Sequence, residues 1–186
     1  MADEGAAVTT SRTENLLPPK RQADRSSYRI IVVCLGNICR SPIGEVVLAD
    51  KIARAGLDDR VEVVSAGTGG WHVGEPMDRR AATVLAAAGY DGSQHRASQF
   101  EAQWHEEYDL VLAMDEDNHT DLGRLAEGGT ERLRMFRDFD PRAAGGDRDV
   151  PDPYFGGDDG FQHVLATIER TSDAIVDALR RELGGD

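Results

Sequence analysis

A short, strongly apolar run that ends in a glycine-containing turn constrains the fold of this chain more than any other feature. Residues 29–34 read Arg-Ile-Ile-Val-Val-Cys. A β-branched run without polar alternation is typical of a strand that is buried on both faces. The turn leads into Ser41-Pro42, and proline suits the first turn of a helix because its missing N–H costs nothing there. A helix is therefore expected from Ser41 to about Ala55, closed by Gly56.

The alternation of strand and helix continues along the chain. Strands are predicted at residues 61–65, 108–113 and 133–136, and helices at residues 78–88, 115–125 and 161–183. Such an alternation indicates a parallel sheet with right-handed crossovers. We therefore expect an α/β fold, a single domain with a twisted four-stranded parallel sheet flanked by helices. The ligand site of such a sheet lies beyond the carboxyl ends of its strands. The segment 138–160 has no period, and a loop of this length inside a domain is expected to be either functional or disordered.

Length, charge and cysteine content exclude several classes of protein. The 186 residues suffice for one domain with a sizeable core, and the formal net charge of −13 argues against nucleic acid or an anionic membrane as partner. No apolar run approaches the roughly 18 residues that a membrane span needs. Two cysteines, Cys34 and Cys39, are too few for a disulfide scaffold or a four-ligand zinc site. We expect a cytoplasmic protein whose residues 1–27 form a disordered N-terminal extension, with a docking tail as the alternative.

The residues that join the first strand to the first helix, Cys34-Leu-Gly-Asn-Ile-Cys-Arg-Ser-Pro42, form a candidate anion site. When the residues between Cys34 and Arg40 bend around a helix start, their backbone N–H groups converge on one point. Arg40 can then hold two phosphate oxygens, and the positive field favours the thiolate of Cys34 as a nucleophile. Gly36 permits close approach, and Asn37 tolerates a left-handed backbone. The spacing alone is a weak signal, because a cysteine after a buried strand is more often a small core residue.

In this context the loop resembles the C-x-G-N-x-C-R-S-P signature of the low-molecular-weight protein tyrosine phosphatases. Further stretches agree with that family in the same order: Ser65-Ala-Gly-Thr, Trp71-His-Val-Gly-Glu-Pro, His95-Arg-Ala, Ala113-Met-Asp-Glu-Asp-Asn118 and Asp152-Pro-Tyr154. The resemblance covers nearly everything from about Tyr28 to Leu183. It implies that residues 28–186 are a phosphatase domain with a phosphate-binding loop after the first strand.

The resemblance implies hydrolysis of phosphotyrosine, an aryl phosphate, through a phosphocysteine intermediate. Cys34 would be the nucleophile, Arg40 the clamp for the phosphate, and Asp152 the general acid and later the general base. The residues implied to bind the phosphate are Leu35, Gly36, Asn37, Ile38, Cys39, Arg40 and Ser41. No metal or other cofactor is implied, because the loop amides and Arg40 supply the positive charge.

Two further groups of residues are implied to support the reaction. A hydrogen-bond network that holds the loop in shape would consist of Asn37, Ser41, Ser65 and His95. The walls of a deep slot for a flat aryl group would be Leu35, Ile38, Trp71, Tyr154 and Phe155. Phe155 departs from family members that carry a second tyrosine, which removes one hydroxyl group. Cys39 is either a partner for a reversible disulfide with Cys34 under peroxide or a buried packing residue.

Three alternative functions stay open at the level of sequence. An arsenate reductase that uses an external thiol fits the loop, whereas the thioredoxin-coupled class needs two downstream cysteines that this chain lacks. Protein arginine phosphatases resemble the loop but carry threonine at the position of Ile38. A catalytically inert phosphopeptide-binding module would not need Cys34, Arg40 and Asp152 together. The expected partners are phosphotyrosine proteins, with a bacterial tyrosine kinase as a candidate, and the expected state is a monomer or weak homodimer.

Overall fold

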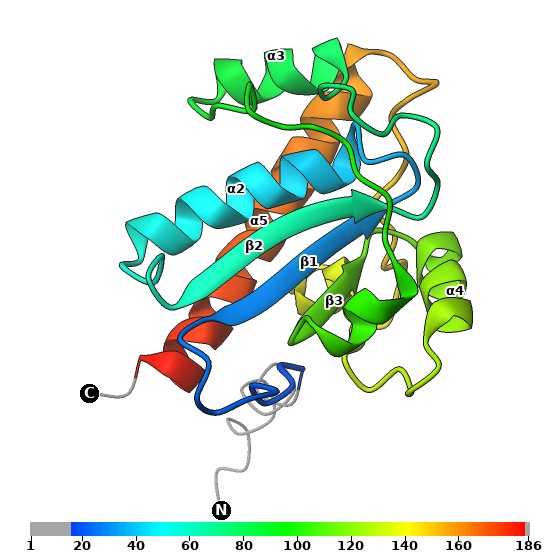
Figure 1. Ribbon diagram of the computed structural model, residues 1–186. Helices are drawn as coiled ribbons and strands as arrows, with labels where there is room; N and C mark the ends of the chain where they lie inside the picture. Colours follow the sequence, from blue (N-terminus) through cyan, green and yellow to red (C-terminus); the bar gives the residue numbers. More distant parts are fainter. Residues whose placement is uncertain (1–15, 185–186) are drawn as a thin grey trace, which may run out of the picture.

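The computed structural model describes residues 16–184 and contains one parallel sheet (Figure 1). Its strands are β1 (Tyr28–Cys34), β2 (Val61–Gly67), β3 (Leu110–Ala113) and β4 (Leu133–Met135). They lie in the order β2-β1-β3-β4, and each neighbouring pair is parallel. The predicted α/β fold with four parallel strands is confirmed.

Helices cover both faces of the sheet, as predicted. They are α2 (Arg40–Arg54), α3 (Arg79–Ala87), α4 (Glu116–Leu125) and α5 (Asp158–Leu183), with two short 3-10 helices, η1 (Ala102–Glu106) and η2 (Phe136–Phe139). Helices α2 and α5 pack together on one face, and α3 packs against α5 (Figure 1). Helix α4 packs on β3 and β4.

Strand β1 lies between two cores, and this explains why its sequence shows no alternation of apolar and polar residues. Ile30 and Val32 point into the larger core, which includes residues of α2 and α5. Ile31 and Val33 point into a second core on the other face of the sheet. All four side chains are fully buried. A strand buried on both faces must be apolar at every position, and its side chains therefore supply both cores.

The boundaries of several elements differ from the prediction. Asp78 and Asp115 do not start helices but cap them, since their carboxylates accept hydrogen bonds from Arg80 N and Asn118 N. Strand β3 begins two residues later than predicted, at Leu110. Helix α5 begins three residues earlier, at Asp158, because two acidic residues in its first turn favour a helix start despite the glycines around them.

The segment before β1 packs against the domain from residue 16 onward. The backbone N–H of Arg21 donates to Asp109 at 2.6 Å, and its Nε donates to the carbonyl of Tyr108 at 2.9 Å. The hydroxyl of Tyr28 donates to the carbonyl of Pro18 at 2.8 Å. These contacts lie at the amino-terminal ends of β1 and β3. The remainder of the predicted extension, residues 1–15, lies outside the described residues.

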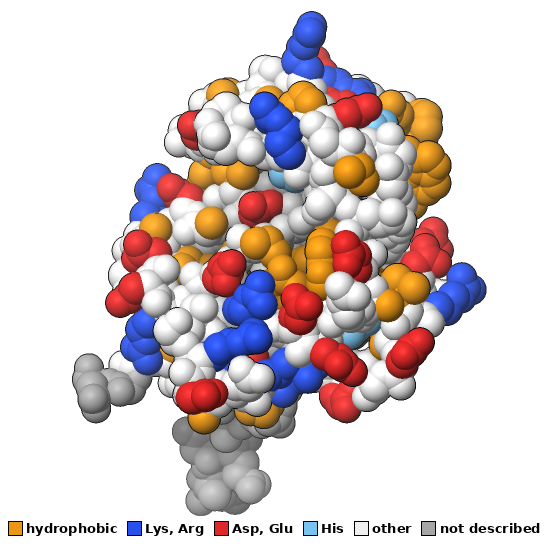
Figure 2. Space-filling view, viewed as in Figure 1, with side chains coloured by type: hydrophobic (Ala, Val, Ile, Leu, Met, Phe, Trp, Pro, Cys, Tyr) orange, Lys and Arg blue, Asp and Glu red, His pale blue; other side chains and the backbone are white. Residues whose placement is uncertain are grey.

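The loop after β1 lies at the topological switch point of the sheet, where the strand order reverses. From β1 the chain crosses to β2 on one side, and β3 lies on the other side. Loops diverge at such a point and leave room for a ligand. In the space-filling view, charges of both signs are mixed, and hydrophobic side chains gather at the edge toward which β1 and β2 point (Figure 2). Among residues 16–184, no helix combines the length and apolar character of a membrane span.

Candidate functional site

Residues 34–41, the phosphate loop, turn tightly between β1 and α2. Asn37 adopts a left-handed backbone with φ of 57°, and no other described non-glycine residue has a positive φ. Gly67 pairs with Cys34 across the sheet. A Cβ atom on Gly67 would lie 2.7 Å from the carbonyl oxygen of Leu35 and 3.0 Å from the nitrogen of Asn37. The loop therefore passes directly over Gly67, a requirement that the sequence analysis did not identify.

The backbone of the phosphate loop presents hydrogen-bond donors without protein acceptors. Among the described residues, no acceptor receives a hydrogen bond from the N–H groups of residues 35–39. The amino terminus of α2 adds the partial positive charge of its dipole at the same place. Together these groups can bind an oxyanion.

The thiol of Cys34 is almost inaccessible and has a hydroxyl neighbour. Its Sγ lies 2.9 Å from Oγ of Ser41. Asn37 Nδ2 donates to Oγ of Ser41 at 2.8 Å and to Oγ of Ser65 at 3.0 Å. Because Ser41 accepts from Asn37, its own proton is available for the sulfur or for the carbonyl of Ala66, 3.2 Å away. Ser41 can therefore stabilise a thiolate at Cys34.

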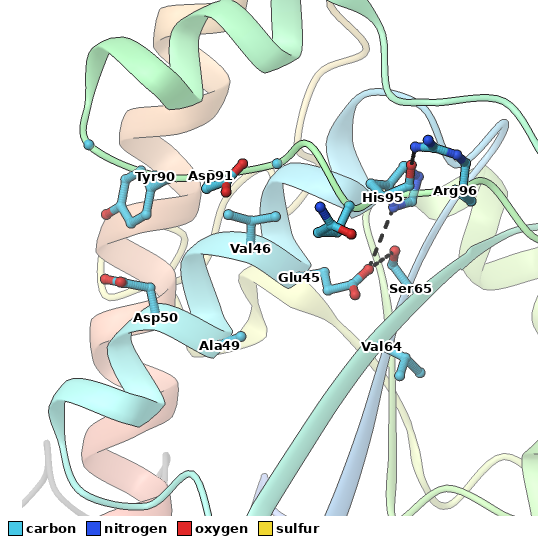
Figure 3. Close-up of a pocket in the computed structure, with 13 residues that line it drawn as sticks. Glu45, Val46, Ala49, Asp50, Val64, Ser65, Tyr90, Asp91, His95 and Arg96 are labelled. Carbon is cyan, nitrogen blue, oxygen red and sulfur yellow. Dashed lines mark hydrogen bonds and ion pairs between the residues drawn. The ribbon is translucent and has the colours of Figure 1, made fainter.

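Glu45 and His95 extend this network behind the phosphate loop (Figure 3). Ser65 donates its hydroxyl proton to Glu45, and His95 Nδ1 lies 3.8 Å from the same carboxylate. His95 Nε2 lies 2.7 Å from the carbonyl oxygen of Asn37 and therefore donates to it. The predicted network of Asn37, Ser41, Ser65 and His95 is thus assembled in the structure. Glu45 was missed, although its position four residues after Ser41 on α2 places both on one helix face.

Arg40 is held by one contact from the turn after β3 and one from the loop that precedes α5. Its guanidinium donates to the carboxylate of Asp115 at 2.5 Å and to the carbonyl of Val150 at 3.1 Å. Burial alone would lower the pKa of Arg40, but the sulfur of Cys34 and the carboxylate of Asp115 raise it above its ordinary value. Arg40 is therefore a permanent cation. Its contact with Asp115 was not predicted, although Asp115 follows the strand next to β1 and shares its carboxyl edge.

The predicted catalytic side chains meet in one slot. Arg40 lies 3.5 Å from the carboxylate of Asp152, which is 39% exposed. A cavity of about 170 Å³ is lined by Cys34, Leu35, Gly36, Ile38, Cys39, Arg40, Trp71, His72, Asp152, Tyr154 and Phe155. All five predicted wall residues are among them, and Phe155 is 93% exposed at the mouth. His72, which was not among the predicted wall residues, packs against Gly36 and pairs with Glu75 at 2.7 Å.

Cys39 is the second thiol of the phosphate loop. Both thiols are buried and free in the structure. Burial, assisted by the charge of Asp78, raises the pKa of Cys39 to about 12. Cys39 therefore stays protonated near neutral pH. Its role in a disulfide with Cys34 stays a prediction.

Comparisons with known proteins agree with the geometry of this site. The family model for low molecular weight phosphotyrosine protein phosphatase matches residues 29–184. A low molecular weight protein-tyrosine-phosphatase of Streptomyces coelicolor is 47% identical over 161 residues, which cover 86% of this chain and 98% of that protein. Low molecular weight protein-tyrosine phosphatase A of Mycobacterium tuberculosis is 45% identical over 148 residues, covering 80% of this chain and 89% of that protein.

The fold has matching solved structures as well. The crystal structure of YfkJ from Bacillus subtilis superposes with a TM-score of 0.79 at 31% identity, covering 87% of this chain and 99% of that one. The family match spans most of the chain and includes the phosphate loop and the residues around it. This chain belongs to the low molecular weight phosphotyrosine protein phosphatase family and is a protein-tyrosine phosphatase.

Proposed function

We propose that the chain hydrolyses protein phosphotyrosine through a phosphocysteine intermediate, with Cys34 as nucleophile, Arg40 as phosphate ligand and Asp152 as general acid. The observation that carries this proposal is the convergence of the three side chains on one slot whose floor is made of unpaired loop amides. The nucleophile and the cation come from the two ends of the phosphate loop, and the carboxyl group comes from the distant loop that precedes α5.

In the first step, the thiolate of Cys34 attacks phosphorus while the bond to the phenolic oxygen breaks. Arg40 and the N–H groups of the phosphate loop bind the equatorial oxygens, whose charge they stabilise in the transition state. The carboxyl group of Asp152 gives its proton to the leaving phenolate. The products of this step are a tyrosine side chain, phosphocysteine and the carboxylate of Asp152.

In the second step, water attacks phosphocysteine. The carboxylate of Asp152 takes a proton from that water, and the thiolate of Cys34 leaves. The hydroxyl of Ser41, 2.9 Å from the sulfur, stabilises the thiolate as it departs. Inorganic phosphate is released, and Asp152 is again protonated, so the cycle is closed without a redox change.

The walls of the slot favour an aryl phosphate over phosphoarginine. Ile38 lines the slot with an apolar side chain, and Trp71, Tyr154 and Phe155 surround its mouth. A flat phenyl ring can pack against such walls, whereas the guanidinium of phosphoarginine would lose hydrogen bonds to water without replacement. Phosphotyrosine proteins are therefore the proposed substrates, and a cytoplasmic location and a bacterial tyrosine kinase as partner stay proposals.

The test is the pH profile of p-nitrophenyl phosphate hydrolysis by the native chain, Cys34→Ser and Asp152→Asn. We expect a bell-shaped profile with an acidic optimum, and no activity in Cys34→Ser. The fall in kcat/KM with rising pH should disappear in Asp152→Asn, because no carboxyl proton is left to lose. Residual activity of Cys34→Ser would refute the phosphocysteine mechanism. Faster turnover of phosphoarginine, or of arsenate with an added thiol, would instead favour one of the two related activities.

A further inference from the structure

A buried ion cluster lies on the loop that carries Asp152 and takes no part in the steps above. Its centre is Asp140, whose side chain has no exposed surface. Arg170 of α5 binds both oxygens of this carboxylate at 2.8 Å, and Arg137 of η2 binds one of them at 2.9 Å. The backbone N–H of Arg142 donates to the same carboxylate at 2.9 Å. These arginines hold the pKa of Asp140 well below its usual range despite its burial, so the carboxylate is charged.

Arg137 extends this cluster toward the catalytic slot. While its Nε binds Asp140, its second nitrogen donates to the carbonyl oxygen of Asp149 at 2.8 Å. Asp149 stands three residues before Asp152, in a stretch without regular secondary structure. Asp140, near the start of the loop, is anchored to α5 through Arg170. Arg137 links this anchored residue to Asp149, which precedes the proposed general acid.

Val150, the residue after Asp149, contacts Arg40 directly. The N–H of Val150 donates to the carbonyl of Met114 at 2.8 Å, and the carbonyl of Val150 accepts from Arg40 at 3.1 Å. The side chain of Asp149 accepts from the N–H of Glu116 at 2.9 Å. Residues 149–150 are thus held by four hydrogen bonds from other segments, and of these four only the bond from Arg137 comes from the Asp140 cluster.

We propose that Arg137, held by Asp140 and Arg170, is a positioning residue for Asp152. It fixes the carbonyl of Asp149 and so sets the height at which the carboxyl group of Asp152 stands above the phosphate loop. The reason is geometric: general acid catalysis requires the carboxyl group within hydrogen-bond reach of the leaving oxygen. Displacements of about 1 Å can cost about a hundredfold in rate. The inference rests on the proposed role of Asp152.

The substitution Arg137→Gln tests this role with little risk to folding. Asp140 keeps its two-oxygen contact with Arg170 and the N–H of Arg142, so no buried charge is left unpaired. Arg148→Gln is the matched control. It makes the same chemical change next to Asp149, but Arg148 is half-exposed and binds Asp138 rather than the carbonyl of Asp149.

The readout is the dependence of kcat/KM on the leaving group, measured with p-nitrophenyl phosphate and free phosphotyrosine. A misplaced general acid slows the release of the more basic tyrosine phenolate most, whereas the release of the less basic p-nitrophenolate depends on the acid to a smaller degree. We expect Arg137→Gln to lower kcat/KM about tenfold for phosphotyrosine and less than about threefold for p-nitrophenyl phosphate. Arg148→Gln should change neither. In Asp152→Asn, adding Arg137→Gln should not widen the difference between the two substrates further.

The outcomes separate this inference from the proposed function. Equal losses for both substrates in Arg137→Gln, or no loss, would overturn the role of Arg137 while leaving Asp152 as general acid. If Asp152→Asn itself shows no leaving-group dependence, the assignment of Asp152 fails and the inference fails with it. Inhibition by inorganic phosphate and the thermal melting curve should stay close to those of the native chain. If Arg137→Gln does not fold, Arg137→Lys replaces it in the same comparison of the two substrates. Lysine keeps the positive charge but lacks the two guanidinium nitrogens that bind Asp140 and Asp149 at once.

Discussion

Replacing Gly67 by alanine tests whether the phosphate loop depends on close contact with β2. The new Cβ would meet three backbone atoms: the oxygen of Leu35 at 2.7 Å, and the nitrogen of Asn37 and the carbonyl carbon of Gly36 at 3.0 Å. Gly67 cannot retreat easily, because its N–H donates to Ser98 and its carbonyl accepts from Phe100, both at 2.8 Å. The phosphate loop therefore has to move.

The size of that movement sets the expected effect. Moving the oxygen of Leu35 from 2.7 Å to the 3.4 Å at which ordinary contacts begin requires about 0.7 Å. A shift of this size in groups that bind the transition state is expected to lower kcat about tenfold to a hundredfold. In free energy this is about 1.4–2.7 kcal/mol of transition-state stabilisation. The free energy of unfolding should fall by about 1–3 kcal/mol, as is usual for overpacking.

Steady-state kinetics with p-nitrophenyl phosphate measure the loss of kcat in Gly67→Ala, and urea unfolding measures the loss of stability. Gly56→Ala is the matched control, because Gly56 has a φ of +72° and no atom within 4 Å of its added Cβ. That substitution should cost about 1–2 kcal/mol of stability through backbone strain alone and leave kcat unchanged. Native kcat in Gly67→Ala, or an equal loss of kcat in both variants, would refute the argument from loop contact.

Three further outcomes are expected from the same contacts. Asn37→Gly should be about 1–2 kcal/mol more stable than Asn37→Ala in urea, because glycine adopts the left-handed backbone of residue 37 without strain, while both variants lose activity with the donors to Ser41 and Ser65. Asp140→Asn should lower the free energy of unfolding by about 3–5 kcal/mol, because Arg137 and Arg170 lose their counter-charge. Since the folded pKa of Asp140 is depressed, this difference should be complete above about pH 4, near the ordinary pKa of 3.8, and shrink as pH falls through the lower folded value. Because the pKa of Cys39 rises from 9.0 to about 12 on folding, the unfolded chain loses this proton first, and stability should fall between those pH values. Urea unfolding at pH 7 and pH 10 should show a smaller fall in Cys39→Ala, and an equal fall would contradict the assignment.

Much of the catalytic site could be predicted from the sequence because it is local. The phosphate loop is one continuous segment of eight residues between a strand and a helix, and it contains both Cys34 and Arg40, the proposed nucleophile and phosphate ligand. Asp152 was found only through resemblance to a family, since an aspartate before proline is by itself a common turn residue. Helix α5 was predicted from its apolar period, and only its first three residues, which follow the N-cap Gly157 and include Gly160, were missed.

The contacts that hold the site together could not be predicted in the same way. Glu45 reaches the network behind the phosphate loop through Ser65. Gly67 contacts the phosphate loop from β2, and Asp115 binds Arg40 from the turn after β3, but the local sequence around these two residues does not show that they make these contacts. Which of them can reach the loop depends on the order of the strands, since only β2 and β3 flank β1. Local sequence patterns do not encode that order.

The sequence by itself therefore determined the buried central strand, the α/β class and the chemistry of the phosphate loop. Backbone propensity and side-chain chemistry act within a few residues, and those residues are adjacent in the chain. Tertiary structure alone decided the close contact of Gly67, the pairing of Arg40 with Asp115 and the ion cluster around Asp140. Each of these joins segments far apart in sequence, and burial away from water is what makes an unpaired charge or a clash costly at those positions.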